Sequence, residues 1–178
     1  MKFDYNKICS EFSFDCPDDF NFAFDVLAKK GSESNKLALI SIDREGNHVQ
    51  DVTYRELDQS SSRFANALLT LGVVKTDNIL VVLPRIPEWY YVLFGCAKMG
   101  AVAMPGTNLL TQNDIEYRIN SAGAKVAVVS DTHAEGLSKI KDRCPTLKHL
   151  IIVRGKRAGW HSYEDICAKA SEHIDRTN

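Results

Sequence analysis

The sequence lacks the signatures of the common nucleotide sites and of membrane insertion. None of the patterns G-x-G-x-x-G, G-x-x-x-x-G-K-[ST] and G-x-S-x-G occurs among its 178 residues, so it holds neither a standard phosphate loop nor a nucleophile elbow. No apolar run approaches the roughly 20 residues that span a bilayer. The N-terminus is acidic and broken by polar side chains, unlike a signal or transit peptide. We therefore expect a cytoplasmic protein with no membrane partner.

An excess of one charge sign is also missing. The chain has 22 Lys and Arg against 23 Asp and Glu, which gives no electrostatic reason to expect a nucleic-acid partner. The five cysteines are odd in number and none stands in C-x-x-C spacing. Because neither they nor the histidines cluster at ligand spacing, we expect reduced thiols and no metal site.

Alternating runs of apolar residues predict the secondary structure from residue 37 onward. Segments 37–43 and 48–54 flank Arg-Glu-Gly-Asn and predict a β-hairpin. Four short apolar strands follow, at 78–84, 101–105, 125–130 and 149–153. Five helices alternate with these strands. The first begins at the Thr53-x-x-Glu56 capping box and ends at Gly72, the second covers 87–99, and the third is capped by Thr111. The fourth is capped by Asp131 and reaches Cys144, and the fifth begins at Ser162 and buries Ala170 and Ile174.

Strands separated by helices predict an α/β fold, a mostly parallel sheet with helices on both faces, preceded by the short β-hairpin. Residues 1–19 look irregular and form a segment of their own. A helix carrying Phe20, Phe24 and Leu27 and ending at Gly31 then begins the α/β unit, which we assign to residues 20–178.

The strand exits are where a parallel sheet holds its ligands. Arg85 follows the first parallel strand, where a structural salt bridge is expected ahead of ligand contact. Residues 106–108, Gly-Thr-Asn, favour a turn over an anion nest. Arg154, Lys156 and Arg157 favour a solvated basic loop over a phosphate contact.

The remaining candidates have structural readings too. His133 could form an acid–base pair with Asp131, but Asp131 is expected to be a helix cap. Trp89, Tyr90 and Tyr91 could stack on a base, but their helix is mostly apolar, so they and Leu93 are expected in the core. The sequence thus predicts no catalytic, cofactor-binding or metal residue.

Three stretches carry a family resemblance: VTYRELDQSSSRFANALLTLGV at 52–73, ILVVLPRIPEWYYVLFGCAKMGAVAMPGT at 79–107 and DIEYRINSAGAKVAVVSD at 114–131. They resemble acyl-CoA synthetases of the acyl-adenylate-forming (AMP-binding) superfamily, and LPR-x-PEW with MPGT is most similar to the medium-chain, butyryl-CoA ligase branch. The resemblance covers nearly everything after residue 20. One departure is Thr76-Asp77, where the family often has Gly-Asp.

The resemblance implies the N-terminal subdomain of an acid–thiol ligase. Such an enzyme uses ATP and Mg²⁺ to convert a short or medium-chain carboxylic acid to acyl-AMP, and CoA then displaces AMP. The family's phosphate loop, adenine and ribose motifs and catalytic lysine belong to parts with no counterpart here, so we expect this chain alone to be inactive. Two alternatives stay open: a stand-alone binding or interaction module with a ligase-like fold, and part of another adenylating ligase for aryl or long-chain acids.

Overall fold

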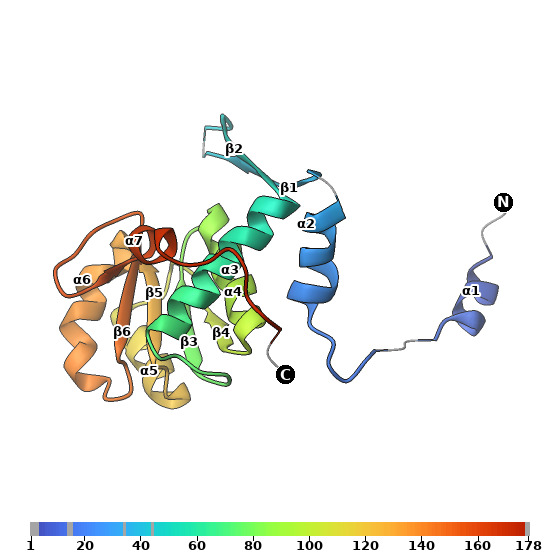
Figure 1. The fold of residues 1–178 in the computed structure, drawn as a ribbon. Coiled ribbons are helices and arrows are strands. Elements are labelled where there is room, and N and C mark those ends of the chain that lie inside the picture. Colours follow the sequence, from blue (N-terminus) through green and yellow to red (C-terminus); the bar gives the residue numbers. More distant parts are fainter. Residues whose placement is uncertain (1–3, 14–15, 34, 44, 177–178) are drawn as a thin grey trace.

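The computed structural model describes residues 4–13, 16–33, 35–43 and 45–176. Its centre is a five-stranded sheet in the order β4-β3-β5-β6-β7, and every pairing in it is parallel. The strands are β3 (Asn78–Val82), β4 (Val102–Pro105), β5 (Val126–Ser130), β6 (His149–Val153) and β7 (His161–Ser162). The antiparallel hairpin of β1 (Leu37–Ile42) and β2 (His48–Thr53) projects beyond one end of this body (Figure 1). The predicted fold class and the hairpin are confirmed.

Helices cover both faces of the sheet, as the fold class requires. On one face, Ile79 and Val81 of β3 pack in a core with α3 (Tyr54–Thr70), α4 (Pro87–Met99) and α7 (Tyr163–Ala168). On the other, Leu80 and Val82 pack with α5 (Gln112–Ala122) and α6 (Asp131–Ile140). Successive side chains of a strand point to opposite faces of the sheet. Because helices cover both faces, every residue of a central strand is buried, and this explains the unbroken apolar runs in the sequence. Within the described residues, no helix combines the length and apolarity needed to cross a bilayer.

The predicted helix boundaries are set by local capping chemistry. Thr53 accepts a hydrogen bond from the Glu56 backbone N–H, and the Glu56 carboxylate accepts from the Thr53 N–H, so the capping box is complete. Thr111 and Asp114 form a second box before α5. At the other end of α4, Gly100 has φ 72°, the left-handed conformation that favours glycine.

The N-terminal segment departs from expectation. Residues 1–19 were expected to be irregular, but α1 spans Tyr5–Glu11, where Asp4 accepts a hydrogen bond from the Lys7 N–H. None of the α1 side chains is buried, so no apolar periodicity announces it. The next helix is also different: a π-helical stretch, Ala23–Ala28, runs into α2 (Lys29–Glu33). Gly31 lies inside α2 because its backbone packs closely on Tyr54.

Two predicted helices are shorter than expected. The predicted α6 included Cys144, but α6 ends at Ile140 and a 3₁₀ turn, Lys141–Arg143, leads to that residue. Its cap is Ser130, and the expected cap Asp131 is the first helical residue. The last helix, α7, ends at Ala168, so Ala170 and Ile174 lie beyond it. The segment after α7 is instead fastened to α3, where Asn66 donates to the Ser171 and His173 carbonyls.

The closest helix packing joins α3 and α4. A Cβ on Gly95 of α4 would lie 2.8 Å from the Ser61 carbonyl oxygen of α3. One turn on, the buried Lys98 ammonium donates to the Asp58 carboxylate at 2.5 Å and to the Ser62 hydroxyl at 2.7 Å. Burial nevertheless lowers the pKa of Lys98, although Asp58 opposes that shift. Glycine thus permits the contact, and an ion pair fixes its register.

Trp89 and Leu93 were expected to be buried, and this is only partly right. Both are half-buried and pack against the edge of the core, whereas the fully buried face of α4 carries Val92, Cys96 and Met99. Of the neighbouring tyrosines, Tyr91 is buried and Tyr90 is 37% exposed. The helix is apolar on most sides, so periodicity alone did not select the inward face.

Thr76 gives a prediction about backbone strain. Its φ is 71°, a conformation that costs a non-glycine residue about 1–2 kcal/mol. A glycine at this position would not pay that conformational cost, but it would lose about 0.5–1 kcal/mol because its more flexible backbone loses more entropy on folding. We expect Thr76→Gly to raise the free energy of unfolding by about 0.5–1 kcal/mol, measured by urea denaturation. As a control, Thr132→Gly in the first turn of α6 should lower it by about 0.3–0.5 kcal/mol. A less stable Thr76→Gly chain would contradict the strain.

Gly95 gives a prediction about helix packing. An alanine Cβ would lie 2.8 Å from the Ser61 carbonyl and 2.9 Å from the Phe64 ring. We expect Gly95→Ala to lower the free energy of unfolding by about 1–3 kcal/mol, because the two helices must separate. Gly136→Ala in α6 is the matched control: its nearest neighbour would be 3.9 Å away, so it should stabilise by up to about 1 kcal/mol. Equal effects at both positions would refute the close α3–α4 contact.

Candidate functional site

The strand order places a switch point beside β3. From β3 the chain passes through α4 to β4 on one side, and through α5 it returns to β5 on the other. In open parallel sheets, the crevice outside the carboxyl ends of the strands at such a point is the usual ligand position. The segments that leave β3, β4, β5 and β6 at this edge begin at Leu83, Gly106, Asp131 and Arg154.

A groove of about 870 Å³ lies at this edge, between the hairpin and the strand exits. The exit of β3 and the first turn of α4 supply residues 84–87 and Tyr90, and the exits of β4 and β6 supply Asn108 and Arg154. The hairpin supplies the opposite wall: Leu39, Ile40, Ser41, Ile42, Asp43, Glu45 and Val49. The groove therefore combines aliphatic side chains with two guanidinium groups and the carboxylates of Asp43 and Glu45.

Arg85 was expected to form a structural salt bridge, and none is found among the described residues. The side chain is exposed in the groove wall, and within the described part of the chain it has no ion pair and no hydrogen bond. Pro84 and Pro87 bracket it and fix the course of the backbone there. Asp43 and Glu45 line the same groove, but neither forms an ion pair with Arg85 among the described contacts.

Arg154 was expected in a solvated loop; it is exposed, but two carboxylates also hold it. Its guanidinium donates to both carboxylate oxygens of Glu88, at 2.8 and 2.9 Å. Its backbone N–H donates to Glu164 at 2.7 Å, and Glu164 also accepts from the Ser162 hydroxyl. With φ 57°, Arg154 is held in the left-handed region. This network links the exit of β6 to α4 and α7.

Sequence reasoning did not assign roles to Glu88 and Glu164. A signal for Glu88 was present, since an acid in the first turn of a helix that follows a strand exit lies at the ligand edge. Nothing in the sequence paired it with Arg154, which lies 66 residues later.

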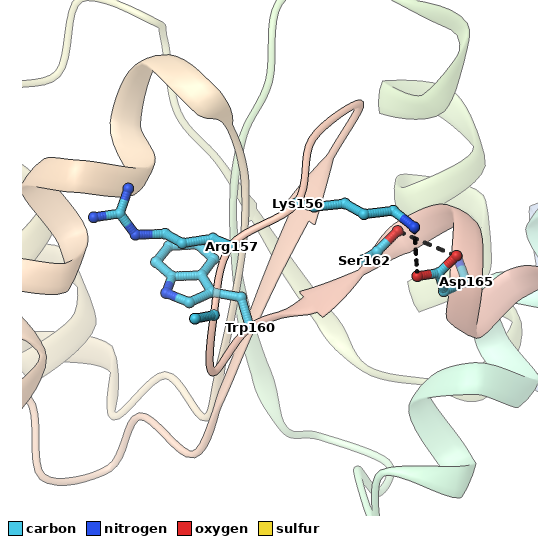
Figure 2. Close-up of a pocket in the computed structure, with 6 residues that line it drawn as sticks. Lys156, Arg157, Trp160, Ser162 and Asp165 are labelled. Carbon is cyan, nitrogen blue, oxygen red and sulfur yellow. Dashed lines mark hydrogen bonds and ion pairs between the residues drawn. The ribbon is translucent and has the colours of Figure 1, made fainter.

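Lys156 and Arg157 line a second, shallower pocket of about 280 Å³ after β6. Figure 2 shows their side chains pointing in opposite directions, Lys156 toward Asp165 and Arg157 past Trp160. The Lys156 ammonium lies 3.3 Å from the Asp165 carboxylate. The two cations therefore do not converge on one anion, and the expectation of a surface loop holds for them.

The Gly-Thr-Asn stretch after β4 is a turn, as expected. The Gly106 N–H donates to the Val81 carbonyl, and the Thr107 hydroxyl accepts from the Leu109 N–H. A Cβ on Gly106 would lie 2.5 Å from the Leu110 side chain. A larger residue here would displace the Leu110 side chain, and the Gly106 N–H is used within the sheet.

His133 does not form an acid–base pair with Asp131 among the described contacts. Its ring makes a hydrogen bond to the Asn108 backbone, while Nε2 is buried without a partner in the described residues. Burial lowers the pKa of His133, and the Asn108 contact opposes this. The neutral ring thus fastens the turn after β4 to α6.

The described residues at this edge of the sheet include side chains that could contact a ligand, but they do not form a catalytic constellation. Among the described residues, no three His, Cys, Asp or Glu side chains gather as they would around a metal ion. Tyr91, which follows the groove residue Tyr90, belongs to the core, and burial raises its pKa to about 12, so it stays protonated at neutral pH. The groove therefore offers apolar surface together with charged groups of both signs.

Comparison with known proteins identifies the family. The sequence model of the AMP-binding enzymes, "AMP-binding enzyme", matches residues 28–176. Rat acyl-coenzyme A synthetase ACSM4, mitochondrial, is 37% identical over 88% of this chain and 28% of its own length. Human acyl-coenzyme A synthetase ACSM3, mitochondrial, is 32% identical over 94% of this chain and 30% of its own length. The chain thus spans less than a third of these relatives.

Two solved structures share the fold. The anthranilate CoA ligase AuaEII, in complex with anthranoyl-AMP, has a TM-score of 0.79 and 22% identity over 91% of this chain and 30% of its own. The Brucella canis acyl-CoA synthetase has a TM-score of 0.80 and 20% identity over 99% of this chain and 32% of its own. The structural match spans this whole α/β unit, and the sequence match spans most of it. The chain belongs to the AMP-binding enzyme family.

Proposed function

We propose that the protein to which this chain belongs is an acyl-CoA synthetase that joins a short or medium-chain carboxylic acid to CoA through an acyl-AMP intermediate. The observation that carries the proposal is the 37% identity with rat ACSM4 over 88% of the chain. The stretches LPR-x-PEW and MPGT support the medium-chain branch, and they lie at the exits of β3 and β4. The proposed substrates are the acid, ATP with Mg²⁺, and CoA.

The residues present do not fit an ATP–magnesium site. The exit of β3 is Leu-Pro-Arg-Ile-Pro, without glycine, so its backbone cannot wrap a phosphate. Gly106 uses its N–H inside the sheet, and the described residues provide no metal-ligand cluster. No chemical step is therefore assigned to these residues.

What the chain contributes is a rigid wall for a site completed elsewhere. The parallel sheet fixes the exits of β3 and β6, and the Glu88–Arg154 pair fixes their separation. Precise positioning of substrates supplies much of an enzyme's rate. A wall of this kind can position a substrate or a catalytic segment without containing a nucleophile or base.

The cellular location stays a prediction. The acidic N-terminal residues favour a cytoplasmic protein, whereas the rat and human relatives carry "mitochondrial" in their names. Imaging of the tagged parent protein beside a mitochondrial marker decides between the two locations.

The parent protein should prefer short or medium-chain acids. We expect kcat/KM for acyl-CoA formation, followed by AMP release across a series of straight-chain acids, to peak at a short or medium length. Aryl and amino acids serve as comparison substrates. An optimum at long-chain or aromatic acids would reject the branch assignment while leaving the family unchanged.

The chain of residues 1–178 alone should form neither acyl-adenylate nor acyl-CoA, because a positioned triphosphate and carboxylate are both required. We expect no pyrophosphate release with several fatty acids and no micromolar ATP–Mg²⁺ binding by calorimetry. The parent protein, under the same conditions, is the positive control. Sustained pyrophosphate release by the short chain would reveal a site within these residues.

A further inference from the structure

The pairing of β6 with β7 brings two histidines together, away from the carboxyl ends of the strands. His161 lies opposite Ile151 in the register of these parallel strands, and His149 stands two residues before Ile151 on β6. Residues two apart on a strand share a face of the sheet, as do paired neighbours. Both rings therefore lie on the face that Ile151 presents to the α3–α4 core, and His149 Nδ1 is 3.4 Å from His161 Nε2.

The distance between the two nitrogens fits a pair of metal ligands. Hydrogen bonds to nitrogen donors usually measure about 2.7–3.2 Å, so 3.4 Å is long for one. Two Zn–N bonds of about 2.0–2.1 Å at a tetrahedral angle separate their nitrogens by about 3.3–3.4 Å. A right angle, as in a square-planar copper or nickel site, would give about 2.8–3.0 Å. The observed spacing therefore favours a tetrahedral ion.

A second contact orients the His149 ring. His149 forms a hydrogen bond with the Leu71 backbone, and the carbonyl is the acceptor because the Leu71 N–H already donates to Ala67 and Leu68. Since Nδ1 faces His161, the nitrogen that donates to Leu71 is Nε2, and Nδ1 keeps its lone pair. Metal-binding histidines are usually held in this way, with the other ring nitrogen donating to a carbonyl or carboxylate.

The surroundings favour a cation of the zinc type. Leu71 is the C-cap of α3, a helix of 17 residues, and the carbonyls at a helix C-terminus carry partial negative charge. Both histidines are half-buried, while the opposing charge of Lys148 is exposed to solvent. Imidazole nitrogens suit Zn²⁺, whereas Mg²⁺ and Ca²⁺ require oxygen ligands that the pair does not supply.

We propose that His149 and His161 form a binding site for a zinc-type divalent cation that joins β6 to β7, with water or a small ligand in the remaining coordination positions. The described residues provide no group of three metal-binding side chains, so the affinity is that of a two-histidine site. β7 is a strand of two residues at the edge of the sheet, and the ion would hold it in place. The two histidines are 12 positions apart, which explains why sequence spacing predicted no metal site. The inference is independent of the proposed function.

Calorimetric titration with Zn²⁺ tests the site. The 178-residue chain carrying Cys9→Ser and Cys16→Ser is used, because those two thiols are exposed and could bind zinc themselves. We expect one zinc ion per chain and no binding of Mg²⁺. His161→Gln keeps a hydrogen-bonding side chain but removes the ligand nitrogen, so it should lower the zinc affinity by about tenfold or more. His48→Gln, which removes a histidine paired with Asp51 on the hairpin, should leave it unchanged. Equal zinc binding by the His161→Gln chain would overturn the proposal.

Thermal unfolding provides the second test. An ion that binds only the folded chain stabilises it, so free zinc at about 100 times its Kd should raise the thermal midpoint by about 5–10 °C. The rise should disappear in His161→Gln, whose circular dichroism without metal shows whether it folds. His149→Gln is a second variant with the same expected loss. A rise that persists in either folded variant would place the ion elsewhere and refute the site.

The parent protein extends the test beyond this chain. Its zinc isotherm should lose one binding event per chain when His161→Gln is introduced, while His48→Gln leaves the isotherm unchanged. Identical isotherms for the parent protein and its His161→Gln variant would refute the site in the whole protein. An assay of acyl-CoA formation is not needed for this decision, so failure of the proposed function and failure of the metal site remain distinguishable.

Discussion

The close contact of α3 with α4 is the constraint on which the rest of the structure depends. Gly95 lets the two backbones approach, and Lys98 locks their register through Asp58 and Ser62. Because α4 is the connection between β3 and β4, its position against α3 fixes where both strands exit the sheet. The buried pair is costly to desolvate, and this favours geometric specificity as its contribution over net stability.

The same constraint reaches the ligand edge. Glu88, in the first turn of α4, receives the Arg154 guanidinium, and Arg154 is in turn joined to α7 through Glu164. A shift of α4 would therefore move Arg85, which lies just before it, and strain the Glu88–Arg154 ion pair. The stretch from Pro84 to Pro105 is so distinctive in sequence because it must satisfy helix packing, sheet packing and edge geometry at once.

Helix boundaries could be predicted from the sequence wherever a capping residue lies at the end of the helix. The capping box at Thr53 and the cap at Thr111 set helix boundaries that the structure confirms. Where local marks were weak, prediction failed: α1 buries nothing, and Gly31 resembled a helix stop although it serves a close contact with α3. The candidate site depended on long-range pairs, such as Glu88 with Arg154, and on the position of β1 beside the strand exits, neither of which a one-dimensional pattern encodes.

The strand order also has a consequence for folding during synthesis. β3 is the first strand of the large sheet to leave the ribosome, and it occupies an interior position. β4 then adds to one side of it, and β5, β6 and β7 add in succession to the other. Each emerging strand therefore finds an edge already formed by earlier sequence, so assembly can proceed vectorially from the amino terminus without waiting for a distant strand.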